Sequence, residues 1–281
     1  MKTEKALCNA IRQCTVSQGQ IAFCWLGQLS LAVKTSQATL YFDLFLTPQP
    51  DRLFPPLFKP EALCDADYIF GSHDHSDHID REAWPKIARA SPQAKFVVPA
   101  LLAKELSQSL QIPFSRFIPV DENQGYEDSR IRIQAVPSAH EFLDRDAHTG
   151  LHPYLGYVVT TQDGVIYHPG DCCPYDGLCA ALQACGPIDL MILPVNGRDG
   201  RRYHRNCIGN MTFQEAADLA GTLSPRLVIP GHYETIADNG SGADAADFIE
   251  MLEAKYPGQH FCLPPHGEIL ILHKDGVSTL F

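Results

Sequence analysis

The sequence predicts an α/β fold in which two β-sheets pack against each other and helices cover their outer faces. Apolar runs typical of strands come first, without intervening helical patterns. Strand and helix patterns then alternate along the chain in two successive series. No internal repeat or low-complexity linker divides the 281 residues, and 45% of them are hydrophobic, which suffices for a sizeable core. We therefore expect residues 1–281 to form one layered domain.

The first half of the chain begins with strands and then alternates between helices and strands. The expected strands are 20–26, 29–34, 39–46, 67–72, 95–99 and 116–120. The expected helices are 81–90 and 100–110. The strand at 67–72 leads directly into a segment that is rich in His and Asp.

The second half repeats the alternation. The expected strands are 131–140, 155–161, 164–171, 189–195, 226–232 and 268–273, and the expected helices are 176–184, 212–223 and 243–255. The helix at 212 has a clear start signal, because Thr212 and Glu215 have the spacing of a capping box.

Charge and composition argue against several classes of protein. The net charge is −11, whereas a nucleic-acid-binding face needs clustered positive charge. The N-terminal segment lacks the apolar core of a secretory signal, and no stretch approaches the about 18 apolar residues of a membrane-spanning helix. The 10 Cys residues are scattered, which favours buried thiols over disulfides. We expect a cytoplasmic protein that binds neither nucleic acid nor membrane, and homo-oligomerisation stays open.

The stretch GSHDHSDHID, residues 71–80, concentrates imidazoles and carboxylates behind an apolar strand. It contains His73, His75 and His78 together with Asp77 and two further Asp residues. A metal site, a proton-transfer site and a solvated polar turn are the three interpretations. Three protonated imidazoles so close together would repel one another, so the cluster makes most sense around a cation.

Further candidate ligands follow three later strands. His140, Asp171 and His232 stand where the segments 131–140, 164–171 and 226–232 end. Loops at strand ends are where a rigid scaffold presents functional side chains. Neighbouring side chains such as Asp77 and His78 point in different directions, which favours two ions over one. Such nitrogen and oxygen ligands suit manganese or zinc, and iron is also compatible.

The motif HDHSDH resembles the H-x-H-x-D-H signature of the metallo-β-lactamase superfamily, and the later ligands follow in that family's order. Asp43 resembles the family's early Asp after a strand. The resemblance extends from about residue 20 to 273 and implies a four-layer αββα sandwich. It implies two divalent metal ions per chain. His73, His75 and His140 would bind one ion, Asp77, His78 and His232 the other, and Asp171 would bridge the two.

The segment from 192 to 234 is similar to the branch of the L-ascorbate-6-phosphate lactonases. That resemblance implies a metal-dependent hydrolase that opens a phosphorylated sugar lactone, such as L-ascorbate 6-phosphate, by attack of a metal-bound hydroxide. Asp77 is then the expected proton shuttle. The alternatives are an RNase Z-like phosphodiesterase acting on nucleotides or RNA, and a metal-dependent sensor without activity.

A basic cluster lies between the strand at 189–195 and the capped helix. Arg198, Arg201, Arg202 and Arg205 occur within eight residues of an otherwise acidic chain. A solvated loop and an anion-binding pocket are both compatible with this pattern, since guanidinium groups bind phosphate or carboxylate through paired hydrogen bonds. The second interpretation assigns these four residues to a small anionic substrate. Of the remaining imidazoles, His168 is expected to orient Asp171.

Overall fold

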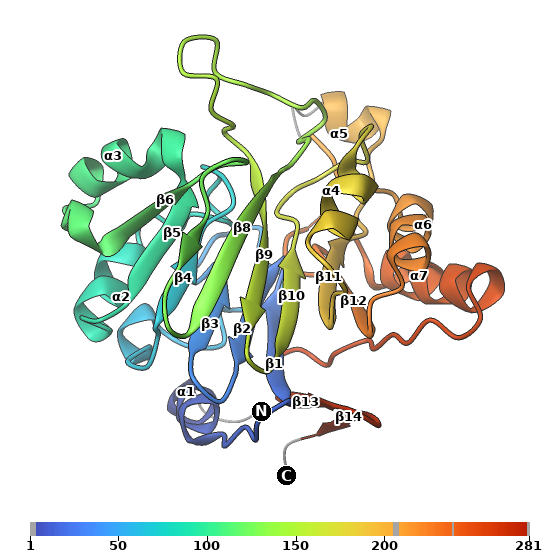
Figure 1. Cartoon of the computed structure of the whole chain (residues 1–281), viewed down its shortest axis with the longest axis horizontal. Helices are drawn as coiled ribbons and strands as arrows, with labels where there is room; N and C mark the ends of the chain where they lie inside the picture. Colours follow the sequence, from blue (N-terminus) through green and yellow to red (C-terminus); the bar gives the residue numbers. More distant parts are fainter. Residues whose placement is uncertain (1–3, 205–207, 238, 280–281) are drawn as a thin grey trace.

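The computed structural model describes residues 4–204, 208–237 and 239–279, in which two β-sheets lie face to face (Figure 1). The eight-stranded sheet has the order β14-β13-β1-β2-β3-β4-β5-β6. Its strands are β1 (Ile21–Gly27), β2 (Ser30–Lys34), β3 (Thr39–Phe42), β4 (Tyr68–Phe70), β5 (Lys95–Pro99), β6 (Phe117–Val120), β13 (Leu270–His273) and β14 (Gly276–Thr279). The six-stranded sheet has the order β12-β11-β10-β9-β8-β7. Its strands are β7 (Tyr126–Glu127), β8 (Ile131–Pro137), β9 (Leu155–Thr161), β10 (Gly164–His168), β11 (Leu190–Pro194) and β12 (Leu227–Gly231).

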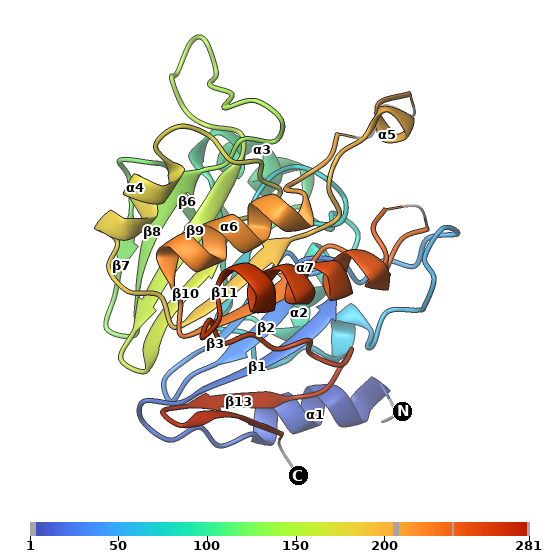
Figure 2. The same ribbon diagram turned by 90° about the vertical axis from the view of Figure 1, so that its right-hand side faces the viewer.

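Helices cover the outer faces of both sheets, as the sequence predicts (Figures 1 and 2). The eight-stranded sheet carries α1 (Glu4–Gln13), α2 (Trp84–Ala90) and α3 (Ala100–Ser109), and the six-stranded sheet carries α4 (Leu178–Ala184), α6 (Phe213–Leu223) and α7 (Gly242–Lys255). The short α5 (Gly200–His204) projects from one end of the molecule, and the 3₁₀ turns are η1 (Pro60–Ala62) and η2 (Phe114–Arg116). No helix within the described residues has the length and apolar character needed to cross a membrane.

Strand β1 shows how the layers are held together, because both of its faces are buried. Phe23 and Trp25 pack in the core between the two sheets, while Ala22 and Cys24 pack in the separate core beneath the outer helices. Successive side chains of a strand point to opposite faces, so the larger side chains fill the space between sheets and the smaller ones lie under helices. A side chain of Leu or Phe size contributes about 1.5–3 kcal/mol when fully buried.

The strand directions bring several loops to one edge of the sandwich. Strands β3 to β6 run parallel to one another, and so do β10, β11 and β12. The carboxyl ends of parallel strands meet at the same edge, so the loops that follow β4, β10 and β12 gather there. The long loop at 141–153 and α5 rise from that end, at the top of Figure 1.

The observed elements differ from the predicted ones at several boundaries. The strand predicted at 39–46 ends at Phe42, because Asp43 adopts a left-handed backbone conformation with φ of 43°. The helix predicted at 81–90 begins at Trp84. Helices α1 and α5 and the short strands β7 and β14 were not predicted. The αββα layering itself is confirmed by the arrangement of sheets and helices.

Candidate metal centre

The loop after β4 delivers four of the predicted ligands. It turns immediately, because the amides of His78 and Ile79 both donate to the carbonyl of His75. Asp80 closes the loop and accepts hydrogen bonds from the amides of Leu46 and Thr47 and from the amide of Ala83, at the start of α2. These bonds hold the loop against the body of the protein and set the positions of its imidazoles.

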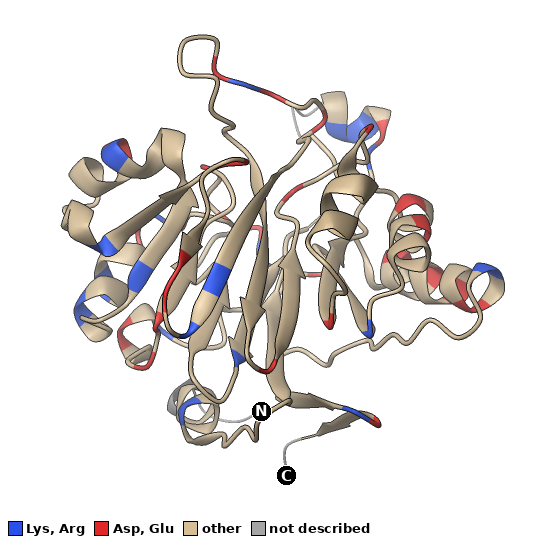
Figure 3. Cartoon of the chain, in the orientation of Figure 1, with Lys and Arg blue, Asp and Glu red and all other residues tan. Residues whose placement is uncertain are grey.

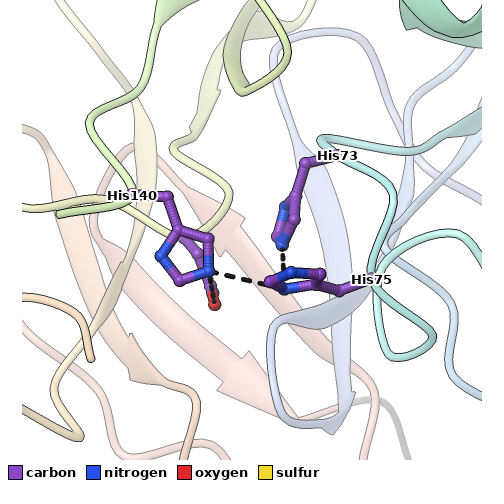
Figure 4. A group of neighbouring side chains, drawn as sticks. His73, His75 and His140 are labelled. Atoms are coloured by element: carbon purple, nitrogen blue, oxygen red, sulfur yellow. Dashed lines mark hydrogen bonds and ion pairs between the residues drawn. The ribbon is translucent and has the colours of Figure 1, made fainter. Parts of the chain in front are cut away.

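The first group of ligands comprises His73, His75, His140 and Asp171, whose ligand atoms all lie within 4.8 Å of one another. His73 Nε2 lies 2.9 Å from His75 Nδ1, and His140 Nε2 lies 3.4 Å from the same atom. Figure 4 shows the three imidazoles converging from the loops after β4 and β8. His140 Nε2 is also 3.6 Å from Asp171 Oδ2.

The second group comprises Asp77, His78 and His232. Asp77 Oδ2 lies 3.6 Å from His78 Nε2 and 3.7 Å from His232 Nε2. The other oxygen of Asp171, Oδ1, lies 3.3 Å from His78 Nε2 and 3.1 Å from His232 Nε2. Asp171 thus presents one oxygen to each group, which is the arrangement expected of a bridging carboxylate.

The donor atoms fit two divalent cations. His78 Nε2 and His232 Nε2 are buried and lie 3.3 and 3.1 Å from Asp171 Oδ1, but none of these three atoms has a hydrogen bond of good geometry among the described residues. Buried polar atoms are otherwise nearly always satisfied, and leaving one unsatisfied costs about 1–3 kcal/mol. A cation at each group would satisfy these atoms, and imidazole and carboxylate ligands suit first-row divalent ions.

Comparison with known proteins agrees with this geometry. Residues 40–233 match the family model for the beta-lactamase superfamily domain. The chain belongs to the metallo-β-lactamase superfamily. It is 31% identical over 212 residues to a UPF0173 metal-dependent hydrolase of Pyrococcus horikoshii, covering 75% of this chain and 84% of that protein. The protein is therefore a metal-dependent hydrolase of this superfamily.

Two further likenesses are more distant. N-acyl-phosphatidylethanolamine-hydrolyzing phospholipase D 1 of Caenorhabditis elegans is 27% identical over 198 residues, which are 66% of this chain and 54% of that relative. The fold is similar to Igni18, a metallo hydrolase from Ignicoccus hospitalis, with a TM-score of 0.68 and 18% sequence identity. That likeness covers 90% of this chain and 98% of Igni18, and it supports the fold alone.

Burial and neighbouring charges shift the pKa values of the candidate ligands in different directions. Burial lowers the pKa of His73 well below its usual value and lowers that of His140, so both imidazoles are neutral and can bind a cation. Burial opposes the charged form of His78, but the nearby carboxylates of Asp171 and two other Asp residues raise its pKa well above the usual value. Burial likewise opposes ionisation of Asp171, yet His232 and His78 lower its pKa well below the usual value. An ion at the second group would thus replace a proton on His78.

Asp43 orients His78 from behind. Its Oδ2 accepts from His78 Nδ1 at 2.6 Å and from Ser72 Oγ at 2.6 Å, and its Oδ1 accepts from the amide of Ser72 at 2.8 Å. Because Nδ1 of His78 is held in this way, Nε2 is directed to the second group. His168, which is expected to orient Asp171, makes no direct side-chain bond to it; its ring nitrogens bond to the carbonyl of Leu29 and to the amide of Gly170, next to Asp171, so any effect on Asp171 is through the backbone.

Gln28, in the turn between β1 and β2, is a site residue that sequence reasoning missed. It is fully buried, its Nε2 donates to Asp77 Oδ2 at 3.2 Å, and its carbonyl accepts from the amide of His232 at 2.8 Å. The same carbonyl accepts from the indole nitrogen of Trp25 at 2.8 Å, and the Trp25 ring stacks on Tyr233 at 4.6 Å. A single polar amide in a tight turn between apolar strands was the only signal in the sequence.

The basic cluster is largely engaged in internal contacts. Arg198 donates two hydrogen bonds to Glu215, at 2.6 and 2.7 Å, and a third to the carbonyl of Asn210. Arg202 is buried and donates to the carbonyl of Asn196. Arg201 is exposed on α5, and Arg205 lies outside the described residues. Substrate binding by these four arginines therefore stays a prediction, with Arg201 the best placed of the described ones.

Proposed function

We propose that this metal-dependent hydrolase cleaves a carboxylic ester or lactone in a small molecule, with two divalent ions held by the seven ligands. The observation that carries the two-ion part of the proposal is the position of Asp171, whose two oxygens face two separate groups of ligands, while the ester or lactone bond is proposed from the family resemblance. We also propose that the two ions are manganese or zinc. The same proposal takes the enzyme to be cytoplasmic and to consist of a single domain.

When bound, a pair of divalent ions supplies a hydroxide nucleophile at neutral pH and polarises the bond under attack. The protein's own residues hold and move the proton. The Asp77 side chain stays 15% exposed, whereas His78 beside it is fully buried, so Asp77 can reach a substrate. Burial raises the pKa of Asp77, but His78 and His232 outweigh burial and lower it. An ionised Asp77 can accept a proton from the attacking group and return it to the leaving oxygen.

The finer substrate assignment, a phosphorylated sugar lactone such as L-ascorbate 6-phosphate, rests on the family resemblance and on the basic cluster. The internal bonds of Arg198 and Arg202 leave fewer free positive charges for a phosphate than the sequence indicates. The proposed reaction is lactone opening, and of the described arginines of the basic cluster Arg201 is the one left exposed to bind a phosphate.

A second candidate is hydrolysis of a phosphodiester. The likeness to a phospholipase D favours it, because that relative is named for cleaving a phosphodiester-containing lipid. The RNase Z-like variant of this candidate has less support, since the net charge of −11 disfavours binding of RNA.

The test is hydrolysis by protein stripped with a chelator and reloaded with zinc or manganese. The substrates are L-ascorbate 6-phosphate, gluconolactone, p-nitrophenyl butyrate and bis(p-nitrophenyl) phosphate. Turnover of a lactone or ester that needs added metal supports the proposal. Preferential turnover of the phosphodiester would replace it with the second candidate, and no metal-dependent turnover of any substrate would contradict both.

A further inference from the structure

Large apolar side chains gather at the edge of the sandwich that holds the metal ligands. Among the described residues, those that are strongly exposed are Leu53, Phe114, Phe142, Leu143, Tyr203, Ile208 and Leu263. All except Phe114 and Leu263 lie on three loops, at 46–58, 141–153 and 196–211, each of which adjoins or contacts a segment that carries a candidate ligand. We call Leu53, Phe142, Leu143, Tyr203 and Ile208 the apolar rim.

The loop at 141–153 carries one part of the apolar rim and begins directly after His140 of the first group of ligands. Phe142 and Leu143 follow His140 by two and three residues, and their side chains are 66% and 43% exposed. Tyr203 of α5 donates its hydroxyl to Glu141, the residue next to His140, at 2.6 Å. This bond connects the second loop of the rim to the first.

The other members of the rim are anchored beside the remaining ligands. The amide of Leu53 donates to the carbonyl of Thr235 at 2.9 Å, three residues after His232. Ile208 precedes Gly209, whose carbonyl accepts from Cys173 Sγ at 3.6 Å, two residues after Asp171. Members of the rim are thus connected, by sequence or by a hydrogen bond, to the segments that carry His140, Asp171 and His232.

A cavity of about 820 Å³ adjoins the rim between α5 and the start of α7. Of the rim, Leu53 lines this cavity, and its other walls are mainly charged or small, with Arg201 and Glu234 among them. The space can therefore hold a polar part of a small molecule beside Leu53.

We propose that the apolar rim binds an acyl or alkyl chain of the molecule whose ester bond is cleaved, so that the substrate is amphiphilic. This inference rests on the proposed function and names the chemistry of the substrate's unreactive part. Exposed apolar side chains that cluster at a site mark a binding surface, whereas single ones do not. A bilayer surface fits less well, because Glu141, Asp144 and Asp146 lie on the same loop as Phe142 and would be repelled by anionic lipids.

Binding of product-like carboxylates tests the inference without any need for turnover. Metal-loaded protein is titrated by calorimetry with butyrate, hexanoate and octanoate below their aggregation concentrations. Each methylene that the rim covers should tighten binding by up to about fourfold, the equivalent of one buried CH₂. Equal affinity for butyrate and octanoate would overturn the proposal.

A matched pair of variants locates the effect. The double variant Phe142→Ser/Leu143→Ser should flatten the dependence on chain length, while Phe114→Ser, which changes a 53% exposed Phe outside the rim, should preserve it. An equal loss in Phe114→Ser would overturn the assignment to the rim. Rim-dependent sedimentation with vesicles, or rim-dependent dimers in ultracentrifugation, would overturn it in favour of a bilayer or a second copy.

The outcomes also separate this inference from the proposed function. Dependence on chain length without ester hydrolysis would leave the apolar rim as a binding site and remove the proposed reaction. Ester hydrolysis with no dependence on chain length would keep the reaction and remove the amphiphilic substrate.

Discussion

The candidate metal ligands and the basic cluster differ in how their polar atoms are hydrogen-bonded within the protein. The imidazoles and carboxylates of the metal centre face one another and leave buried atoms such as His232 Nε2 without a hydrogen-bond partner among the described residues. Arg198 donates two hydrogen bonds to Glu215, whereas Arg202 donates to the carbonyl of Asn196 and its buried Nε has no hydrogen-bond partner among the described residues. Convergent buried atoms without a partner leave room for a ligand, whereas the paired bonds of Arg198 indicate a structural role. The following experiments challenge that contrast.

Substitution of the shared carboxylate should have the largest effect. Asp171→Ala removes the carboxylate whose two oxygens face the two groups of ligands, so we expect binding of both ions to weaken and activity to fall by more than the about 100-fold typical of outer partners. Elemental analysis and turnover measure this. Asp163→Ala is the control, because Asp163 is also buried but bonds to Gly19 and Ser36, remote in sequence from the ligands. Full metal content in Asp171→Ala would contradict the shared site.

Loss of Gln28 should have the next largest effect. Gln28→Ala frees Asp77 from its hydrogen bond, and we expect the second ion to bind about 10–100-fold more weakly while the first is retained. A stepwise cobalt titration followed by absorbance distinguishes the two ions. The control is Gln93→Ala, which loses a side-chain amide that donates to the carbonyl of Ala66. This variant should bind both ions with wild-type affinity. Equal weakening of both ions would show that Gln28 supports the fold and not one site.

Metal binding should release protons and strengthen as pH rises. The pKa of His78 is raised by Asp171 and two neighbouring carboxylates, so the metal-free protein retains a proton that the second ion must displace. Lower pH favours the proton and higher pH favours the metal. Calorimetry in buffers of different ionisation enthalpy measures the proton count. Loading without proton release would show that His78 is already neutral.

Substitution of the arginines should give the smallest effects. Loss of Arg198 should lower stability, whereas loss of Arg201 should change substrate preference. Arg198→Ala breaks a partly exposed pair with Glu215, so we expect a loss of about 0.5–1 kcal/mol of stability, which lowers Tm by about 1–4 °C. Arg201→Ala should leave Tm unchanged and reduce any preference for a phosphorylated lactone over its dephosphorylated form. If Arg198→Ala abolishes that preference with an unchanged Tm, Arg198 binds substrate and the contrast fails.

The sequence predicted the convergence of the candidate ligands better than the contacts around them, and the reason is physical. Candidate ligands such as His140 and His232 follow strands, and the strand pattern is periodic and local, so their convergence could be inferred. The pairing of Arg198 with Glu215 depends on how a loop folds back onto α6, which no local pattern records. Gln28 reaches Asp77 across 49 residues of sequence and was invisible for the same reason.

The prediction of the fold likewise succeeded for long periodic elements and failed for short ones. Alternating apolar runs indicated both sheets, including β1 with two buried faces. The early end of β3 was missed because Leu44 and Phe45 continue the apolar pattern, although Asp43 turns the backbone away to bond with Ser72. The two-residue strand β7 and the five-residue helix α5 are too short for periodicity to be detected.

The contacts of Trp25 give the protein an intrinsic optical reporter. Trp25 is one of two Trp residues in the chain. Its ring stacks on Tyr233, and its indole nitrogen donates to the carbonyl of Gln28, whose side chain bonds to Asp77. Any rearrangement of the second group of ligands is therefore transmitted to a fluorophore in direct contact with its supports. We therefore expect tryptophan emission to report occupancy of the second group without a label, and Trp25→Phe to leave only the signal of Trp84.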